Sequence, residues 1–286
     1  MTGKIFSKNW ETMKWSKWIP LNAPHKVFRQ LTTKPGVYRV RAVELDILVY
    51  IGQTGRSLRG RLNALRRNIY GTIMPYNDPH TAAPNLWAWY QENKYQYECS
   101  VASVILSKPN RQALEDMLLW QHRILTGKST LCNYGRFHHR YIKSRNSATG
   151  FRGYKLPANE YNTSGGRSTA PLNPLGMPHG SFWMELSWSP AVPLDRISLR
   201  KIPSDKGLYK IVNSDKNRIL YVGETKNLRD RCRSHLNKDW NGKPTGVSYF
   251  TLNEELFDYQ VRELEADLIG CYYSIYGEAP PFQYGR

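Results

Sequence analysis

Two pairs of tyrosines with the same spacing are the residues of this chain best suited to chemistry. The first pair is Tyr38 and Tyr50, in the tripeptides Gly-Val-Tyr and Tyr-Ile-Gly. The second pair is Tyr209 and Tyr221, in Gly-Leu-Tyr and Tyr-Val-Gly, and eleven residues separate the tyrosines in both pairs. A tyrosine hydroxyl can orient a water molecule or, if its pKa is lowered, deprotonate it. The pairs therefore indicate two places for a hydrolytic reaction.

An arginine and a glutamate follow each pair. Arg61 and Glu115 follow the first pair, and Arg231 and Glu265 follow the second. A guanidinium group can stabilise the charge that develops on a phosphate in a transition state. A single carboxylate can hold Mg²⁺, because this ion accepts few protein oxygens and keeps several of its waters. The residue types therefore favour phosphodiester hydrolysis with one metal ion at each place.

The spacing of these residues indicates an internal duplication. Glu115 is followed 18 residues later by Asn133, and Glu265 is followed 18 residues later by Gln283. Tryptophans and prolines also precede both tyrosine pairs. A repeat of this kind means that the chain holds two copies of one unit, and each copy starts well upstream of its tyrosines.

Each tyrosine pair is expected on a β-hairpin that is followed by a helix. β-Branched and aromatic residues with partial alternation predict strands at 37–43, 45–51, 207–212 and 218–222. Ser57 in the first half and Asn227 in the second are suited to cap the helix that follows. Arg231 and His235 are four residues apart on the second of these helices, so they are neighbours on its surface.

The composition favours a soluble protein with a polyanionic partner. Lys and Arg number 41 against 23 Asp and Glu, which gives a net charge of +18 and makes nucleic acid the expected partner. A length of 286 residues with 40% hydrophobic content suffices for two globular domains. The four scattered cysteines, the polar start of the chain and the lack of a long apolar run predict a reduced, cytoplasmic location with no membrane segment.

The expected order is a first domain at 1–137, a linker at 138–181 and a second domain at 182–286. The first domain includes an N-terminal arm and an insertion at 71–96, whose aromatic residues either contact DNA or form a satellite hydrophobic cluster. The linker is basic and rich in Gly, Ser and Pro, so it either follows DNA phosphates or serves as an inert tether. The cations expected to contact DNA are Arg59, Arg66, Arg140, Lys143, Arg145, Arg152 and Lys155.

The ordered series of glycine-tyrosine tripeptides, arginine, glutamate and terminal amide resembles the GIY-YIG nuclease superfamily. The resemblance covers about 100 residues of each half and occurs twice. It implies an α+β fold with two tandem GIY-YIG-type domains, each a three-stranded antiparallel sheet flanked by helices. The two domains would be related by a pseudo-twofold axis, and the chain would act as a monomer with an internal pseudo-dimer.

The resemblance also implies a role for each matching residue. Tyr50 and Tyr221 would act as, or assist, the general base, while Tyr38 and Tyr209 would orient the water or the scissile phosphate. Arg61 and Arg231 would stabilise the transition state. Glu115 and Glu265 would each bind one Mg²⁺ or Mn²⁺. The remaining candidate catalytic residues are His235 and Asn133.

Each half departs from the pattern at one secondary position. Leu65 stands in the first half where the second has His235, and Gln283 stands in the second half where the first has Asn133. The leading expectation is an endonuclease of restriction or defence type that cuts both strands of duplex DNA with two active sites. Two alternatives remain: a structure-specific repair or recombination nuclease with one active half, and a catalytically inactive DNA-binding protein.

Overall fold

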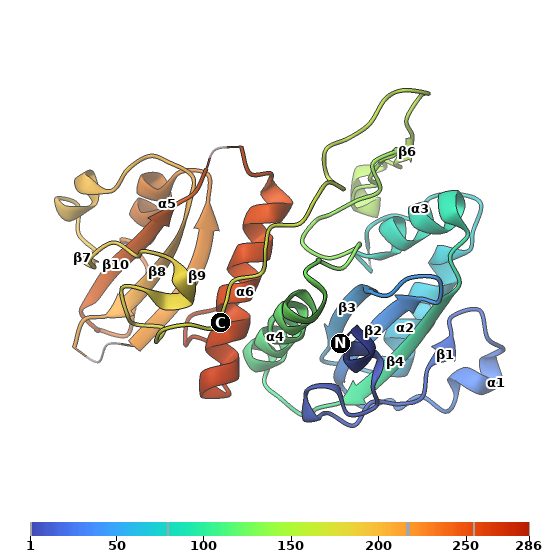
Figure 1. Ribbon diagram of the computed structural model, residues 1–286. Helices are drawn as coiled ribbons and strands as arrows, with labels where there is room; N and C mark the ends of the chain where they lie inside the picture. Colours follow the sequence, from blue (N-terminus) through green and yellow to red (C-terminus); the bar gives the residue numbers. More distant parts are fainter. Residues whose placement is uncertain (1, 79, 216–217, 254, 286) are drawn as a thin grey trace. The chain divides into compact units, whose positions relative to one another are not determined.

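The strands expected around the two tyrosine pairs form in two separate antiparallel sheets (Figure 1). The structure is a computed structural model, and it describes residues 2–78, 80–215, 218–253 and 255–285. The chain clusters into two units. Unit 1 comprises 1–111 and 121–168, and unit 2 comprises 112–120 and 169–286.

The sheet of unit 1 has the strand order β1-β4-β2-β3, with antiparallel pairing throughout. Its strands are β1 (Ile19–Pro20), β2 (Gly36–Ala42), β3 (Leu48–Thr54) and β4 (Tyr97–Ser103). The predicted hairpin is therefore present as β2 and β3. The sheet has four strands where we expected three, because the N-terminal arm adds the two-residue strand β1 to the edge of β4.

The sheet of unit 2 repeats this arrangement with the order β7-β10-β8-β9. Its strands are β7 (Val192–Pro193), β8 (Gly207–Asn213), β9 (Arg218–Thr225) and β10 (Thr245–Thr251). The register of the hairpin shifts after the fifth residue of the central strand in both sheets, at Val40/Arg41 and at Ile211/Val212. The strand β7 again adds a fourth, edge strand to the expected three.

The helices begin where the sequence predicts a cap. The Ser57 hydroxyl accepts from the Gly60 N–H, and the Asn227 side chain accepts from the Asp230 N–H, each at 3.0 Å. Both expected caps are therefore confirmed. The helices are α1 (His25–Phe28), α2 (Leu58–Ile69), α3 (Ala83–Asn93), α4 (Lys108–Thr126), α5 (Leu228–Ser234) and α6 (Asp258–Tyr276).

The central strands β2 and β8 are covered on both faces. Every residue of β8, and every residue of β2 except Arg41, is buried. In unit 1, one face carries Tyr38 and Val40, which pack into the core cluster with the apolar side of α2. In unit 2, Tyr209 and Ile211 pack in the same way with α5. Each first tyrosine is thus rooted in the core of its unit.

The opposite face of β2 buries a cation, Arg39, against tryptophans of the N-terminal arm. Its guanidinium carbon lies 4.2 Å from the ring centroid of Trp15 and 4.7 Å from that of Trp18. Its Nη2 donates to the carbonyl of Ser7 at 2.8 Å. Cation–π attraction and the bond to the carbonyl fasten the arm to the sheet.

In unit 2, Lys210 fastens the segment before the sheet in the way that Arg39 fastens the N-terminal arm in unit 1. Its Nζ lies 4.6 Å from the ring centroid of Trp188 and donates to the carbonyls of Pro178 and Gly180, both at 2.8 Å. In each unit two tryptophans five residues apart stack, and the second donates its indole N–H to the carbonyl of the first at 3.0 Å. The similarity of the two units therefore extends upstream of the tyrosine pairs.

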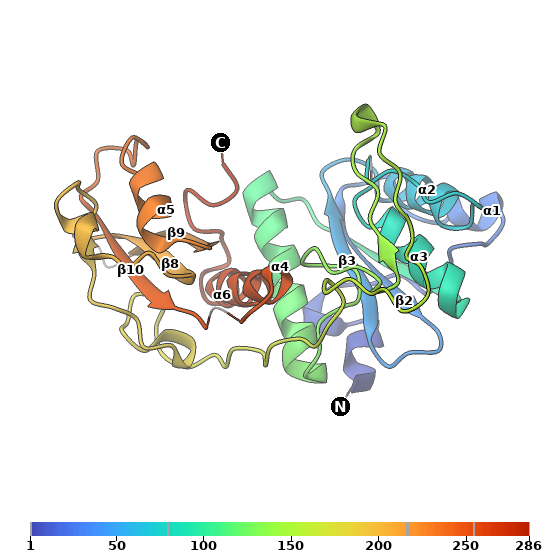
Figure 2. The same cartoon turned by 90° about the horizontal axis from the view of Figure 1, so that it is seen from above.

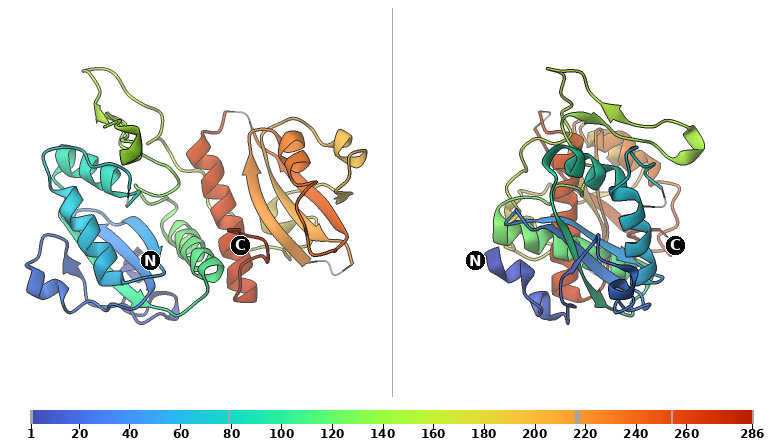
Figure 3. Two further views of the ribbon diagram at one scale, coloured as in Figure 1. Left: turned by 180° about the vertical axis from the view of Figure 1, so that it is seen from behind. Right: turned by 90° about the vertical axis from the view of Figure 1, so that its right-hand side faces the viewer.

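The insertion of unit 1 folds onto its core. Its helix α3 lies beside α2 in the view from above and in the view from behind (Figures 2 and 3). Trp87 packs with Met74 and Phe137, and the Trp89 ring meets those of Tyr95 and His138. These contacts favour the hydrophobic cluster over exposed DNA-contacting aromatics.

The expected linker is folded in its first part. A small hairpin of β5 (Tyr141–Ile142) and β6 (Tyr154–Lys155) belongs to unit 1 and stands out from its sheet (Figure 3). The backbone of 169–181 is grouped with unit 2. Among the described residues, no helix is both long and apolar enough to cross a membrane.

Candidate active site

Unit 2 brings four of the predicted catalytic residues together around one hydroxyl group. The Tyr209 hydroxyl lies 2.9 Å from Nε2 of His235 and accepts a hydrogen bond from Nε–H of Arg231, also at 2.9 Å. The ring of Tyr221 stacks on that of Tyr209, with centroids 5.9 Å apart. The His235 ring touches both tyrosines, at 5.6 Å from Tyr209 and 5.4 Å from Tyr221.

The glycine of the second tripeptide makes room for the first tyrosine. Tyr209 pairs with Gly223 across the hairpin, and a Cβ on Gly223 would lie 2.5 Å from the Tyr209 hydroxyl oxygen. In unit 1, a Cβ on Gly52 would lie 2.6 Å from the hydroxyl of Tyr38. Any larger residue would displace the hydroxyl, so the fixed spacing of the motif has a steric cause.

Burial sets the protonation state of the cluster in unit 2. It raises the pKa of Tyr209 well above the ordinary value for a tyrosine, helped by Tyr221 and opposed by Arg231. Burial also lowers the pKa of His235 to about 4, with contributions from the positive charges of Arg231 and Lys238. At neutral pH the cluster therefore consists of neutral tyrosine and neutral imidazole beside a guanidinium.

Unit 1 places a histidine at its first tyrosine that the sequence did not reveal. The Tyr38 hydroxyl lies 2.9 Å from Nε2 of His80, a residue of the insertion just before α3. The His80 ring is 6.0 Å from the Tyr38 ring and 5.9 Å from the Tyr50 ring, and the tyrosine rings are 5.9 Å apart. We expected Leu65 to leave this half without a histidine, and the structure supplies one from elsewhere.

Two further predicted residues of the first half, Arg61 and Glu115, lie on helices. Arg61 is on α2, and its positive charge contributes, after burial, to lowering the pKa of His80 to about 3. Glu115 is on α4, within the stretch 112–120 that clusters with unit 2, and its side chain is half-buried.

The side chains of the two terminal amides form hydrogen bonds with the backbone and not with a tyrosine side chain. Asn133 hydrogen-bonds both the N–H and the carbonyl of Ile51, at 3.0 and 2.8 Å. Gln283 hydrogen-bonds the N–H and the carbonyl of Val222, both at 3.0 Å. Ile51 and Val222 each follow the second tyrosine of a pair, so glutamine performs in unit 2 what asparagine performs in unit 1.

Glu265 has the properties of a carboxylate suited to a cation. It is half-buried on α6, and burial, together with the carboxylates of Glu224 and Asp116, raises its pKa to about 8 against the opposing effect of Arg262. Burial and the neighbouring carboxylates disfavour the ionised form of Glu265, and a bound divalent cation would stabilise that form. Among the described residues no group of three His, Cys, Asp or Glu is placed to hold a metal ion.

Most of the cations predicted to contact DNA also hold the fold of unit 1. The Arg59 side chain donates to the carbonyls of Arg29 and Leu31, at 2.6 and 2.7 Å. Arg66 and Arg152 donate to the carbonyls of Ala23 and Met74. Arg140 donates to the carbonyls of Glu160 and Leu156. The Arg145 guanidinium lies over the Phe151 ring, and Lys155 forms an ion pair with Glu92 at 2.5 Å. Lys143 is the residue directly after β5.

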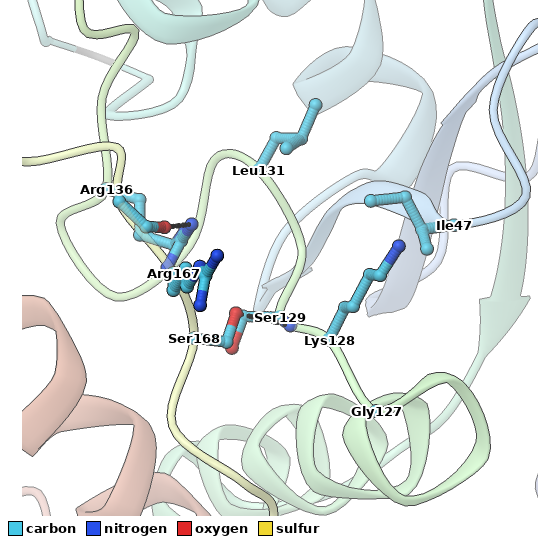
Figure 4. A pocket seen from close by; sticks show the side chains of 9 residues that line it. Ile47, Gly127, Lys128, Ser129, Leu131, Arg136, Arg167 and Ser168 are labelled. Carbon is cyan, nitrogen blue, oxygen red and sulfur yellow. Dashed lines mark hydrogen bonds between the residues drawn. The ribbon is translucent and has the colours of Figure 1, made fainter.

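A pocket of about 390 Å³ in unit 1 lies apart from the predicted catalytic residues (Figure 4). Its wall is formed by the stretch after α4 and by the backbone at 166–168, with Lys128, Arg136 and Arg167 among the lining side chains. Neither Tyr38, Tyr50 nor His80 lines it. The pocket is therefore not where the tyrosine chemistry would occur.

A lysine of unit 2 was also missed in the sequence. The Nζ of Lys238 lies 5.4 Å from the ring centroid of Tyr221 and 4.8 Å from that of Trp240. Burial and the charge of Arg231 lower its pKa. Because α5 ends at Ser234, no helical spacing relates Lys238 to His235, and the sequence offers no signal for this contact.

Comparison with known proteins finds two similar relatives. The chain is 34% identical over 85 residues to UvrABC system protein C of Borrelia duttonii (strain Ly), and equally to that of Borrelia recurrentis (strain A1). The match covers 27% of this chain and 14% of each relative, so the chain spans about a seventh of their length. No solved structure matches the chain.

A family match covers the site itself. Residues 205–268 match the GIY-YIG catalytic domain. The tyrosine pair of unit 2, Arg231, His235 and Glu265 all lie inside this range. The residues that the geometry brings together are therefore among those that match the GIY-YIG catalytic domain.

Proposed function

We propose that this protein is a metal-dependent DNA endonuclease that hydrolyses phosphodiester bonds. The observation that carries the proposal is the Tyr209 hydroxyl, held between Arg231 and His235 at 2.9 Å each within the GIY-YIG segment. The net charge of +18 supports double-stranded DNA as the substrate.

The residues of unit 2 have distinct roles in this proposal. Tyr221 assists removal of a proton from the attacking water, and Tyr209 orients the water or the scissile phosphate. Arg231 stabilises the charge of the transition state, because its guanidinium is already fixed on Tyr209. Glu265 would hold one Mg²⁺ or Mn²⁺, whose chemistry when bound is to polarise the phosphate and a coordinated water.

We propose further that unit 1 is a second copy of the same domain and that each unit cuts one strand. The same strand order, the same register shift and the matching tyrosine–histidine contacts support this proposal. Tyr38, Tyr50 and Arg61 take the roles of their counterparts, with Glu115 as the carboxylate. A chain with two such sites would produce double-strand breaks, as a restriction-type enzyme does.

A repair-type nuclease is the second candidate. The similarity to UvrABC system protein C supports it over a restriction type. Such an enzyme would cut branched or damaged DNA faster than intact linear duplex, and would leave nicks. An inactive DNA-binding protein is the third candidate, and the contacts of Tyr209 with Arg231 and His235 argue against it because DNA binding alone does not need them.

The test is a cleavage assay on a panel of plasmid and phage DNA, with flap and junction substrates added. Wild-type protein with Mg²⁺ or Mn²⁺ is expected to cut, and chelation of the metal or the Glu265→Ala substitution is expected to reduce cutting. Linear product from plasmid supports two active units, while nicks and a preference for flaps support the repair alternative. Binding without metal-dependent cutting of any substrate would reject the endonuclease proposal.

A further inference from the structure

The insertion of unit 1 delivers a histidine to the first tyrosine pair. His80 lies at the turn before α3, where its carbonyl accepts from the Ala83 N–H at 3.0 Å. Ala83 and Leu86, from the first turn of α3, belong to the same core cluster as Tyr38. The start of α3 is therefore packed in the core of unit 1, and this packing fixes the position of the His80 ring.

The two histidines reach their tyrosines from different parts of the sequence. His80 follows Tyr38 by 42 residues, whereas His235 follows Tyr209 by 26 and comes from the end of α5. Both place Nε2 at 2.9 Å from the hydroxyl, with ring centroids between 5.4 and 6.0 Å from both tyrosines. The same arrangement is thus reached by two routes.

His80 is a costly residue for packing alone. It is completely buried, and its Nδ1 has no hydrogen-bond partner among the described residues. A buried polar atom without a partner is unfavourable, and an apolar side chain would fill the space without that penalty. The other ring nitrogen, Nε2, lies within hydrogen-bond distance of the Tyr38 hydroxyl, so that contact is what the histidine provides.

We propose that His80 is a positioning residue of the first active unit and holds the Tyr38 hydroxyl as His235 holds that of Tyr209. This inference rests on the proposed nuclease function. The proposal explains why the first half has an insertion, since the insertion supplies His80. The second half has its histidine at the end of the helix after the hairpin, so it needs no insertion. The proposal also means that Leu65 does not make the first unit degenerate.

Electrostatics agrees with the assignment. Burial, followed by the charge of Arg61, lowers the pKa of His80. Burial and Arg231 do the same to His235. Both rings are neutral at neutral pH and can share a hydrogen bond with a hydroxyl without adding a second positive charge beside the arginine.

The experiment follows supercoiled plasmid through nicked to linear form. In His80→Gln, we expect one of the two strand cuts to slow by on the order of 10²-fold, with DNA binding unchanged, so that nicked circles accumulate. The matched control is His122→Gln, because His122 is equally buried in unit 1 but accepts from the Leu48 N–H instead of meeting a tyrosine. The control should linearise plasmid at the wild-type rate per folded molecule.

A rescue variant separates positioning from simple loss of folding. Leu65 stands four residues after Arg61, as His235 stands four after Arg231. Leu65→His combined with His80→Ala should therefore return linear product to within about tenfold of wild type, because an imidazole again reaches the hydroxyl. If His80→Gln linearises plasmid at the wild-type rate, the proposal is overturned while the nuclease function stands.

A second measurement does not require cleavage. With ¹³C-labelled tyrosine, the ring signal of Tyr38, assigned through Tyr38→Phe, should shift in His80→Gln and stay in place in His122→Gln. An unchanged signal in His80→Gln would overturn the contact, whether or not the protein cuts DNA. A shifted signal in a protein that cuts nothing would retain the contact and reject the nuclease function.

Discussion

The side-chain amide of Asn133 hydrogen-bonds both backbone polar groups of Ile51. Gln283 makes the same two bonds with Val222. Since Ile51 follows Tyr50 on β3, the amide fixes the strand that carries the second tyrosine. The amide acts through the backbone, so its role in catalysis would be to position Tyr50.

Replacing Asn133 should therefore lower stability as well as activity. Asn133→Ala leaves two buried backbone groups without their partner, and we expect a loss of about 2–3 kcal/mol in the free energy of unfolding. Urea denaturation measures it, with Asn63→Ala, at a half-buried position of α2, as the control. An unchanged urea midpoint for Asn133→Ala would contradict this assignment.

The bond from Arg231 to Tyr209 predicts a difference between two arginines of α5. Arg231→Lys keeps the charge but loses the Nε donor to the hydroxyl, so the cleavage rate should fall by roughly 10²-fold or more. Arg233 on the same helix is exposed and pairs with Asp230. Arg233→Lys should cut DNA like wild type, and equal loss in both variants would argue against a specific role of Arg231.

The two histidines make stability depend on pH. The folded pKa values are about 3 for His80 and about 4 for His235, against about 6.5 in the unfolded chain. Because the folded pKa lies below the unfolded one, the unfolded state binds more protons at pH values between the two. The neutral histidines therefore contribute to the free energy of unfolding above pH 6.5, and this contribution is lost as the pH falls toward 4. Urea denaturation from pH 7.5 to 4.5 should show a shallower decline for the double variant His80→Gln, His235→Gln. Equal declines in the wild type and the double variant would contradict the lowered pKa values of the two histidines.

Lys210 should contribute to stability through the segment that it fastens. Lys210→Met deprives the carbonyls of Pro178 and Gly180 of their donor and removes the cation from Trp188, and we expect a loss of about 2–4 kcal/mol. Thermal unfolding compares it with Lys226→Met, since Lys226 is exposed in a surface ion pair. A melting temperature equal in both variants would show that the bound lysine has no structural role.

The features that the sequence predicts well are local. The hairpins, the caps Ser57 and Asn227 and the proximity of Arg231 to His235 depend on residues a few positions apart. Such short-range patterns determine strands, turns and helix ends directly.

The features that it does not predict depend on contacts across the fold. His80 meets a tyrosine 42 residues away, and no periodicity of the insertion marks it. The spacing already places Gln283 where the first half has Asn133, but only the structure shows that both amides bind the backbone of the second strand. The edge strands β1 and β7 have two residues each, which is too short for a period-2 pattern to appear.

If each unit cuts one strand, as we propose, removing the hydroxyl of the second tyrosine in either unit should slow the formation of linear product. Tyr50→Phe and Tyr221→Phe each remove one hydroxyl and keep the ring that packs beside the histidine. Single-turnover assays on supercoiled plasmid should show nicked circles accumulating in each single variant and uncut plasmid in the double variant. Linear product formed at the wild-type rate by either single variant would contradict the claim.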